Sequence, residues 1–173
     1  MRRWDVVVGI INEKKMKTFA EVGVCKGETA YPVAMHCPSL EKYYLIDPKF
    51  APQFWGNTLI APKGMNKYAI LKKEFPVFDL MEMTSEDAAP LIPDGSLDGC
   101  FIDALHYDPY ISQDIDLWTP KVRPGGVICG HDYENRRFPD VKAAVDKKYG
   151  VENVATISVR MCKVWIYHVP EVG

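Results

Sequence analysis

Short apolar runs alternate along the chain with longer segments in which apolar residues recur at helical spacing. The apolar runs predict strands at residues 18–24, 43–47, 77–81, 97–103, 127–131, 154–159 and 163–168. The longer segments predict helices at residues 27–36, 66–74, 85–89, 109–118 and 138–149. Strands separated by helix-length segments are typical of βαβ units and indicate a parallel sheet.

Two of the runs, "GCFID" at 99–103 and "GGVICG" at 125–130, are apolar at consecutive positions, which predicts strands with helices covering both faces. The last two runs are joined by only Arg160, Met161 and Cys162, too few residues for a parallel crossover, so they predict an antiparallel hairpin. We therefore predict an α/β fold, a Rossmann-like doubly wound seven-stranded sheet. It is mostly parallel and ends in an antiparallel C-terminal hairpin strand.

The composition is that of a single globular domain over residues 1–173, with a short N-terminal segment at 1–17 before the first strand. Apolar residues make up 47% and charged residues 25%, and the net charge of −2 argues against nucleic-acid binding. The five cysteines are scattered without a C-x-x-C spacing, which fits a reducing compartment. We see no signal peptide and no membrane-spanning run, and we therefore expect a cytoplasmic protein.

The segment "FAEVGVCKGETA" at 19–30 joins the first predicted strand to its helix, where ligands bind in open parallel sheets. Gly23 and Gly27 would let the backbone approach a ligand closely, and Gly27 would also allow tight helix packing. Glu21 would repel a pyrophosphate but attract a cationic group. Asp47, at the end of the second strand, is suited to the hydroxyls of a ribose. Two acids at neighbouring strand ends favour a positively charged adenosyl compound, such as S-adenosylmethionine with its sulfonium and ammonium groups.

Two further motifs, "FIDALHYDPY" at 101–110 and "RPGGVICGHDY" at 123–133, follow in order. With them the chain resembles the class I S-adenosylmethionine-dependent methyltransferases, in the small branch with I-D-x-x-H-x-Y and P-G-G-x-I-x-x-H-D-Y signatures. The resemblance runs from residue 19 to about residue 149. It implies S-adenosyl-L-methionine as cofactor and a small-molecule acceptor. It places the cofactor-binding residues at Glu21, Gly23, Cys25, Gly27, Asp47, Thr84, Ser85 and Asp103.

Asp103 and His106 lie on one loop at the carboxyl end of the fourth predicted strand. The resemblance places Asp103 near the methionyl end of the cofactor, and His106 is suited to act as a general base. Both are therefore the candidate catalytic residues. The alternative is that Asp103 caps the next helix while His106 packs against its turn. Asp108, directly before Pro109, is the better N-cap candidate and leaves Asp103 free.

The pair His131 and Asp132 ends the fifth predicted strand. Some relatives of this fold hold a divalent cation near these positions, which makes Asp103 and Asp132 candidate metal ligands for Mg²⁺. His131 counts against Mg²⁺, because a hard cation prefers oxygen to nitrogen. The alternative for His131 and Asp132 is a structural turn in which the carboxylate accepts backbone N–H groups.

After the third predicted strand the family often places an acid and a serine near the adenine. In this chain Thr84 stands at the position of the acid and Ser85 matches the serine. Thr84 would bond the adenine amino group more weakly than a carboxylate, or Glu82 would replace it in a shifted register. Ser85 followed by Glu86 is equally typical of an ordinary helix start.

These observations predict a methyltransferase that O-methylates a small hydroxylated acceptor such as a sugar, with His106 as base. The alternatives are a non-catalytic module that binds an adenosyl ligand or a partner, and an NAD(P)-dependent oxidoreductase, against which Glu21 and the missing third glycine argue. Because only about 17 residues precede the first strand, the acceptor site is either open or completed by a second subunit of a homodimer. The long connection at 48–64 contains aromatic residues suited to a lid, to packing or to a subunit contact.

Overall fold

The structure is a computed structural model that describes residues 1–48, 73–160 and 162–171. Residues 49–64 of the predicted connection and most of the predicted helix at 66–74 lie outside these residues. Within the described residues, no helix has both the length and the apolar character needed to cross a membrane.

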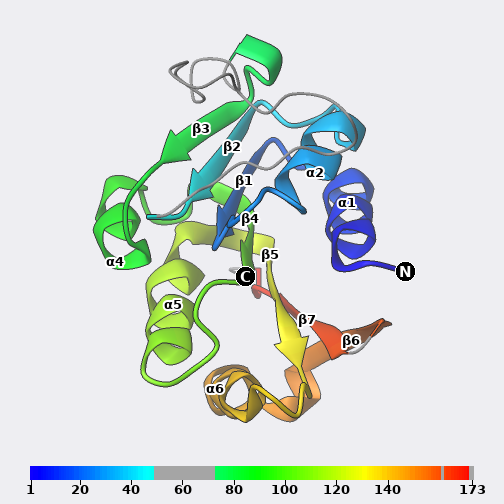
Figure 1. Cartoon of the computed structure of the whole chain (residues 1–173), viewed down its shortest axis with the longest axis vertical. Helices are drawn as coiled ribbons and strands as arrows, with labels where there is room; N and C mark the ends of the chain where they lie inside the picture. The colour runs from blue at the N-terminus through cyan, green and yellow to red at the C-terminus, as the bar shows by residue number, and fades with distance from the viewer. Residues whose placement is uncertain (49–72, 161, 172–173) are drawn as a thin grey trace.

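One seven-stranded sheet forms the centre of the molecule, with the strand order β3-β2-β1-β4-β5-β7-β6 (Figure 1). Its strands are β1 (Thr18–Val22), β2 (Lys42–Ile46), β3 (Phe78–Met81), β4 (Leu97–Ile102), β5 (Val122–Tyr133), β6 (Val154–Val159) and β7 (Cys162–His168). Strands β1 to β5 pair in parallel, whereas β7 is antiparallel to both β5 and β6. The predicted fold class, including the antiparallel C-terminal hairpin, is therefore confirmed.

Helices cover both faces of the sheet (Figure 1). Helices α1 (Arg3–Lys14) and α2 (Ala30–His36) pack on one face, and α4 (Ser85–Ala88), α5 (Tyr110–Trp118) and α6 (Pro139–Tyr149) on the other. Short 3-10 turns follow at Ala89–Leu91, Thr119–Lys121 and Val151–Asn153. The two buried clusters thus separate along the two faces of each central strand, as the apolar runs predict.

Helix α1 was not predicted from the pattern. Its valines and Gly9 have low helix propensity, so the segment does not look helical by itself. It is held instead by burial of Val6, Val7 and Ile11, which pack in the same cluster as Phe19 of β1. The N-terminal segment therefore adds a covering helix to one face of the sheet.

The boundaries of two other helices differ from the prediction. Helix α5 begins at Tyr110 with Pro109 as its N-cap residue, so the prediction of Asp108 as N-cap is wrong. Asp108 instead accepts a hydrogen bond from Oγ of Ser112 at 2.6 Å. Helix α2 begins at Ala30 and not at residue 27, because Gly27 has a φ of 80°, outside the helical region.

Candidate active site

The carboxyl ends of the parallel strands meet on one edge of the sheet. β1 lies between β2 and β4, so consecutive strands leave it in opposite directions along the sheet, and ligands bind at such a switch point. Asp103 directly follows β4, and His131 and Asp132 lie at the end of β5. Because β7 is antiparallel, its first residue, Cys162, lies at this same edge.

Gly23 follows β1 with a φ of 90°. A Cβ at this position would lie 2.4 Å from the carbonyl oxygen of Asp103 and 2.5 Å from Cα of Ala104. The space that Gly23 leaves open is therefore filled by the backbone at the end of β4, which fixes Asp103 beside the turn. At Gly27 a Cβ would lie 2.7 Å from the ring of Tyr31, so the predicted tight packing against the helix is confirmed.

Asp47 and Cys25 join the ends of β1 and β2. The backbone N–H of Cys25, which has a φ of 49°, donates to Oδ2 of Asp47 at 2.7 Å. The structure thus brings the glycine turn and the predicted ribose-binding acid together at one point of the edge. Their contacts with a cofactor stay a prediction.

Glu21 is buried in β1, with 2% of its surface exposed, and the hydroxyl of Tyr43 donates a hydrogen bond to its carboxyl group. Burial raises the pKa of Glu21 to about 8, more than the bond from Tyr43 lowers it. The carboxyl group is therefore mostly protonated at pH 7. Its predicted attraction for a cationic cofactor requires that it first lose this proton.

Thr84 and Ser85 form the start of helix α4. The hydroxyl of Thr84 caps the helix by accepting a hydrogen bond from the N–H of Asp87 at 3.2 Å. The hydroxyl of Ser85 accepts a hydrogen bond from Nε1 of Trp118 at 2.7 Å. The interpretation as an ordinary helix start is confirmed, and adenine contacts of these residues stay a prediction.

Two aspartates and a histidine meet beyond the ends of β4 and β5. Nε2 of His106 lies 3.2 Å from Oδ1 of Asp103 and 2.9 Å from Oδ2 of Asp132. Nδ1 of His131 lies 3.1 Å from the same Oδ2 of Asp132. We call Asp103, His106, His131 and Asp132 the Asp–His cluster.

The two carboxylates determine the charge of His106. Burial lowers the pKa of His106, but its hydrogen bonds to Asp103 and Asp132 outweigh this and raise the pKa to about 9. Burial would raise the pKa of Asp132, but hydrogen bonds from His106, His131 and Asn135 hold it well below its usual range. At pH 7 His106 is therefore an imidazolium whose Nε2–H donates to both carboxylates.

The backbone at the end of β5 aims the side chain of Asp132. Asp132 has a φ of 58°, in the left-handed region that non-glycine residues rarely adopt. The pairing of β5 with β7 shifts its register between Gly130 and Tyr133, as in a β-bulge. Asn135 Nδ2 donates to Oδ1 of Asp132 at 2.5 Å and leaves Oδ2 facing the two histidines.

Arg3 was not predicted as a site residue. Its Nε lies 3.3 Å from Oδ2 of Asp103 and 3.3 Å from Oγ1 of Thr29, and its Nη2 lies 3.1 Å from Oε2 of Glu28. The side chain thus ties the start of α1 to the end of β4 and to the loop after β1. A local pattern gives no signal for a contact between residues 100 positions apart.

Cys162 was also missed. Its Sγ lies 3.0 Å from Nε2 of His131, and burial raises its pKa to about 11, so it is a thiol at neutral pH. A signal for it exists in the sequence. The predicted antiparallel hairpin places the first residue of the last strand at the edge where the parallel strands end.

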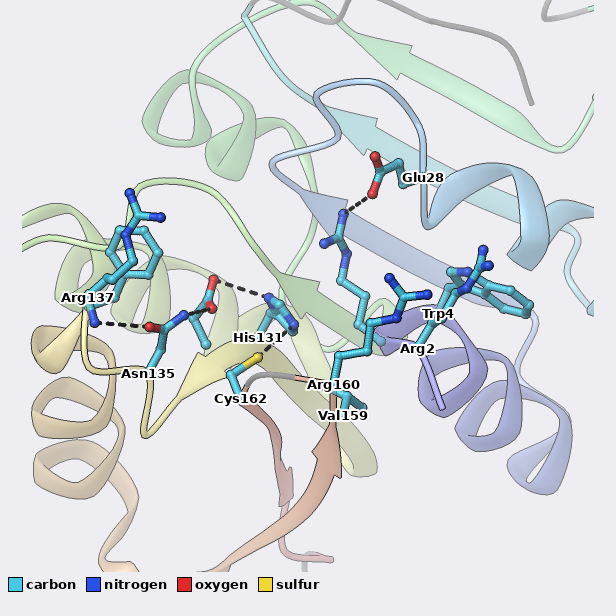
Figure 2. Close-up of a pocket in the computed structure, with 12 residues that line it drawn as sticks. Arg2, Trp4, Glu28, His131, Asn135, Arg137, Val159, Arg160 and Cys162 are labelled. Carbon is cyan, nitrogen blue, oxygen red and sulfur yellow. Dashed lines mark hydrogen bonds and ion pairs between the residues drawn. The ribbon is translucent and has the colours of Figure 1, made fainter. Parts of the chain in front are cut away.

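A cavity of about 570 Å³ opens beside the cluster (Figure 2). It is lined by Arg2, Arg3, Trp4, Glu28, His131, Asp132, Asn135, Arg137, Phe138, Val159, Arg160 and Cys162. His131 and Asp132 therefore face the cavity, whereas His106 and Asp103 are not part of its lining. The volume is within the range of small-molecule sites, roughly 300–1,000 Å³.

The donor set of the cluster does not suit Mg²⁺. The groups near enough to share an ion are Asp103, His106 and Asp132 in one set, and His131, Asp132 and Cys162 in the other. Mg²⁺ demands oxygen ligands in near-octahedral geometry, and each set contains a nitrogen donor. In addition, Asp103 and Asp132 already have two cationic partners, the His106 imidazolium and the guanidinium of Arg3. These residues thus fit a proton-carrying cluster better than a magnesium site.

The chain is similar to known methyltransferases. A family model described as a methyltransferase domain matches residues 20–133. The O-methyltransferase TomG from Streptomyces achromogenes, solved in complex with SAM, is 14% identical with a TM-score of 0.70, and the match covers 97% of this chain and 79% of that one. No curated protein matches the chain in sequence.

Other solved structures with this fold act on different groups. The N-methyltransferase NodS from Bradyrhizobium japonicum WM9 is 14% identical, with a TM-score of 0.65 and coverage of 98% of this chain and 95% of that one. A spermidine synthase from Thermotoga maritima is 14% identical, with a TM-score of 0.65 and coverage of 93% of this chain and 56% of that one. At such identities the likeness establishes the fold and leaves the acceptor open.

Proposed function

Since the chain belongs to the methyltransferase domain family, whose model matches residues 20–133, we propose that it transfers the methyl group of S-adenosylmethionine to a hydroxyl of a small molecule. The observation that carries the proposal is the cavity of about 570 Å³ whose lining includes His131 and Asp132. The glycine turn, Asp47 and Asp103 are the proposed cofactor side of the site. The cavity is the proposed acceptor side.

Methyl transfer is an in-line displacement at a carbon that the sulfonium already activates. The protein mainly has to align the acceptor oxygen with the methyl carbon, at about 3 Å, and remove the hydroxyl proton. A sugar is one acceptor of suitable size and chemistry. The two histidines of the Asp–His cluster are the candidates for the base that removes this proton.

His106 is the base expected from the sequence, but its contacts favour a different role. Its Nε2–H donates to Asp103 and Asp132, so this nitrogen is not available to accept a proton at neutral pH. Its hydrogen bond to Asp132 helps to hold the pKa of that carboxyl well below its usual range in a half-buried site. We assign His106 this positioning and charge-balancing role.

His131 is the better candidate for the base because it lines the cavity. Its Nδ1 contacts Asp132, which orients the ring as a carboxylate orients the base of a catalytic triad. Its Nε2 is then the acceptor, and in this structure the weakly donating thiol of Cys162 faces it at 3.0 Å. A hydroxyl of the acceptor would take the place of the thiol.

The test is a methyl-donor consumption assay with a panel of hydroxylated acceptors, preceded by calorimetry with S-adenosylmethionine and S-adenosylhomocysteine. The proposal expects binding of both compounds, turnover with a hydroxylated acceptor, and a loss of roughly 100-fold or more in kcat for His131→Gln. Cys162→Ala is the matched control, because it removes the thiol that contacts Nε2 of His131 and leaves the imidazole in place. We expect this variant to retain turnover. A protein that binds neither compound, or a His131→Gln enzyme with full turnover, would contradict the proposal.

A further inference from the structure

Asn135 lies on the turn between β5 and α6 and lines the cavity. Its amide oxygen, Oδ1, accepts a hydrogen bond from the backbone N–H of Arg137 at 3.0 Å, and its Nδ2 donates to Oδ1 of Asp132 at 2.5 Å. Figure 2 shows the Asn135 side chain between Arg137 and His131. The backbone N–H of Asn135 also donates to the carbonyl oxygen of Asp132 at 3.1 Å. Backbone and side chain together therefore fix Asn135 against Asp132.

The direction of each hydrogen bond in this series follows from the backbone amide of Arg137. A backbone N–H only donates, so the amide oxygen of Asn135 must face it and the amide NH₂ group must face Asp132. The hydrogen bonds that hold the pKa of Asp132 well below its usual range keep this group an ionised carboxylate, which only accepts. Nδ1 of His131, at 3.1 Å from Oδ2 of Asp132, is therefore the donor and carries a hydrogen. In the neutral ring the lone pair is then on Nε2.

Asn135 also determines which oxygen of Asp132 the histidines share. Because Asn135 occupies Oδ1, the two histidines contact Oδ2, Nε2 of His106 at 2.9 Å and Nδ1 of His131 at 3.1 Å. The same turn supports His106, because the N–H of Phe138 donates to the carbonyl oxygen of Asn135 at 3.0 Å and the Phe138 ring stacks on His106, with centroids 4.6 Å apart. Without the amide of Asn135 the carboxylate would be free to turn, and Nδ1 of His131 would lose its fixed acceptor.

We propose that Asn135 is a positioning residue that selects the tautomer of His131 in which Nδ1 carries the hydrogen and Nε2 is the base. In the other tautomer Nε2 carries the hydrogen and cannot take the proton of an acceptor hydroxyl. The catalytic consequence rests on the proposed function, whereas the tautomer is a property of the free protein. Asn135 acts through Asp132 and His131, so it affects the chemical step more than the binding of the acceptor.

The experiment records heteronuclear NMR spectra of the full chain with isotope-labelled histidine, at about pH 8, where an ordinary imidazole is neutral. The chain has four histidines, and His131→Gln identifies the signals of His131. We expect the Nδ1–H tautomer at His131 in the unmodified protein and a mixture of tautomers in Asn135→Leu, which keeps the shape of the side chain but donates no hydrogen bond. In the same variant kcat should fall by roughly 10- to 100-fold, while KM changes by less than about twofold.

Asn153→Leu is the matched control. Nδ2 of Asn153 donates to the carbonyl oxygen of Tyr149 at 2.8 Å, so this variant also loses a side-chain hydrogen bond, but Asn153 does not line the cavity. We expect it to leave the tautomer of His131 and kcat unchanged. Thermal unfolding of both variants measures the cost in stability.

An Nε2–H or doubly protonated ring at His131 in the unmodified protein would overturn the inference without any variant. An unchanged tautomer in Asn135→Leu would overturn it too, since any loss of stability would then show a structural role alone. The proposed function fails by a different result. If Asn135→Leu alters the tautomer as expected but the unmodified protein methylates no hydroxylated acceptor, the role of Asn135 stands and the proposed function does not.

Discussion

Nε2 of His106 and Oδ2 of Asp132 lie 2.9 Å apart, and this contact joins the loop after β4 to the end of β5. The same nitrogen lies 3.2 Å from Oδ1 of Asp103, so one imidazolium contacts two carboxylates. The side chains of His106 and Asp132 are only 18% and 10% exposed, so solvent screens their interaction weakly. The contact therefore affects both the stability of the fold and the charge of the site.

His106→Gln is expected to destabilise the protein at pH 7 and much less above pH 9. The rise of the His106 pKa from 6.5 to about 9 corresponds to roughly 3 kcal/mol of stabilisation. Because the folded pKa is the higher one, this stabilisation is fully present below about pH 6.5 and is lost as the pH rises through 9. Urea unfolding from pH 6 to 10 measures the difference, with exposed His168→Gln as control. A pH-independent difference would contradict the charge assignment.

Glu21 is expected to make the binding of S-adenosylmethionine depend on pH. Burial raises its pKa from 4.5 to about 8, and a bound cation would favour loss of that proton. Binding then releases a proton, and affinity falls by up to about tenfold for each pH unit below 8. Calorimetry in two buffers of different ionisation enthalpy detects the proton. In Glu21→Gln the pH dependence disappears, and its persistence there would assign it to another group.

Gly23→Ala is expected to be much more destabilising than Gly95→Ala. Both glycines have positive φ, 90° and 66°, so both substitutions introduce backbone strain of roughly 1–2 kcal/mol. Only at Gly23 does the added Cβ also meet backbone, at 2.4 Å from the carbonyl oxygen of Asp103. Thermal unfolding should show a larger loss of stability for Gly23→Ala than for Gly95→Ala. Calorimetry should show weaker binding of S-adenosylhomocysteine to Gly23→Ala and unchanged binding to Gly95→Ala. Equal losses would mean that strain, and not the approach of β4, explains this glycine.

Much of the fold follows from the local pattern. Consecutive apolar residues predict buried parallel strands, and the short link around Cys162 predicts the antiparallel hairpin. Helix α1 could not be predicted in this way, because it is stabilised by burial of Val7 and Ile11 and not by propensity. Asp108 has good N-cap chemistry, yet the helix begins one residue later than that chemistry indicates.

The site was predicted only in part, because the local pattern locates strand ends but not contacts between distant segments. Strand ends and motifs locate Asp103, His106 and Asp132, and the structure brings these three together. Which histidine faces the cavity depends on the left-handed backbone of Asp132 and on the packing of β7, and neither leaves a signal in the pattern. The contacts of Arg3 depend on where the two ends of the chain meet in space.

Chelation of divalent cations is expected to leave the activity unchanged within about twofold. The reason is the donor set, in which nitrogen atoms of His106 and His131 stand beside the carboxylates. Turnover measured in EDTA, and again after addition of Mg²⁺ or Mn²⁺, tests this expectation. Loss of turnover in EDTA that Mg²⁺ restores would reverse our conclusion about the cluster.

Arg3→Gln is expected to loosen the start of α1 and to lower turnover. The substitution removes the contacts of Arg3 with Asp103, Glu28 and Thr29. Because the Arg3 side chain is 30% exposed, we expect the loss of stability to be only about 1 kcal/mol. The effect on kcat should exceed the effect on stability, because Asp103 loses its partner on α1. Lys14→Gln, at the other end of the same helix, is the control, and unfolding and turnover are measured for both. If both variants behave alike, the position of Asp103 does not depend on α1.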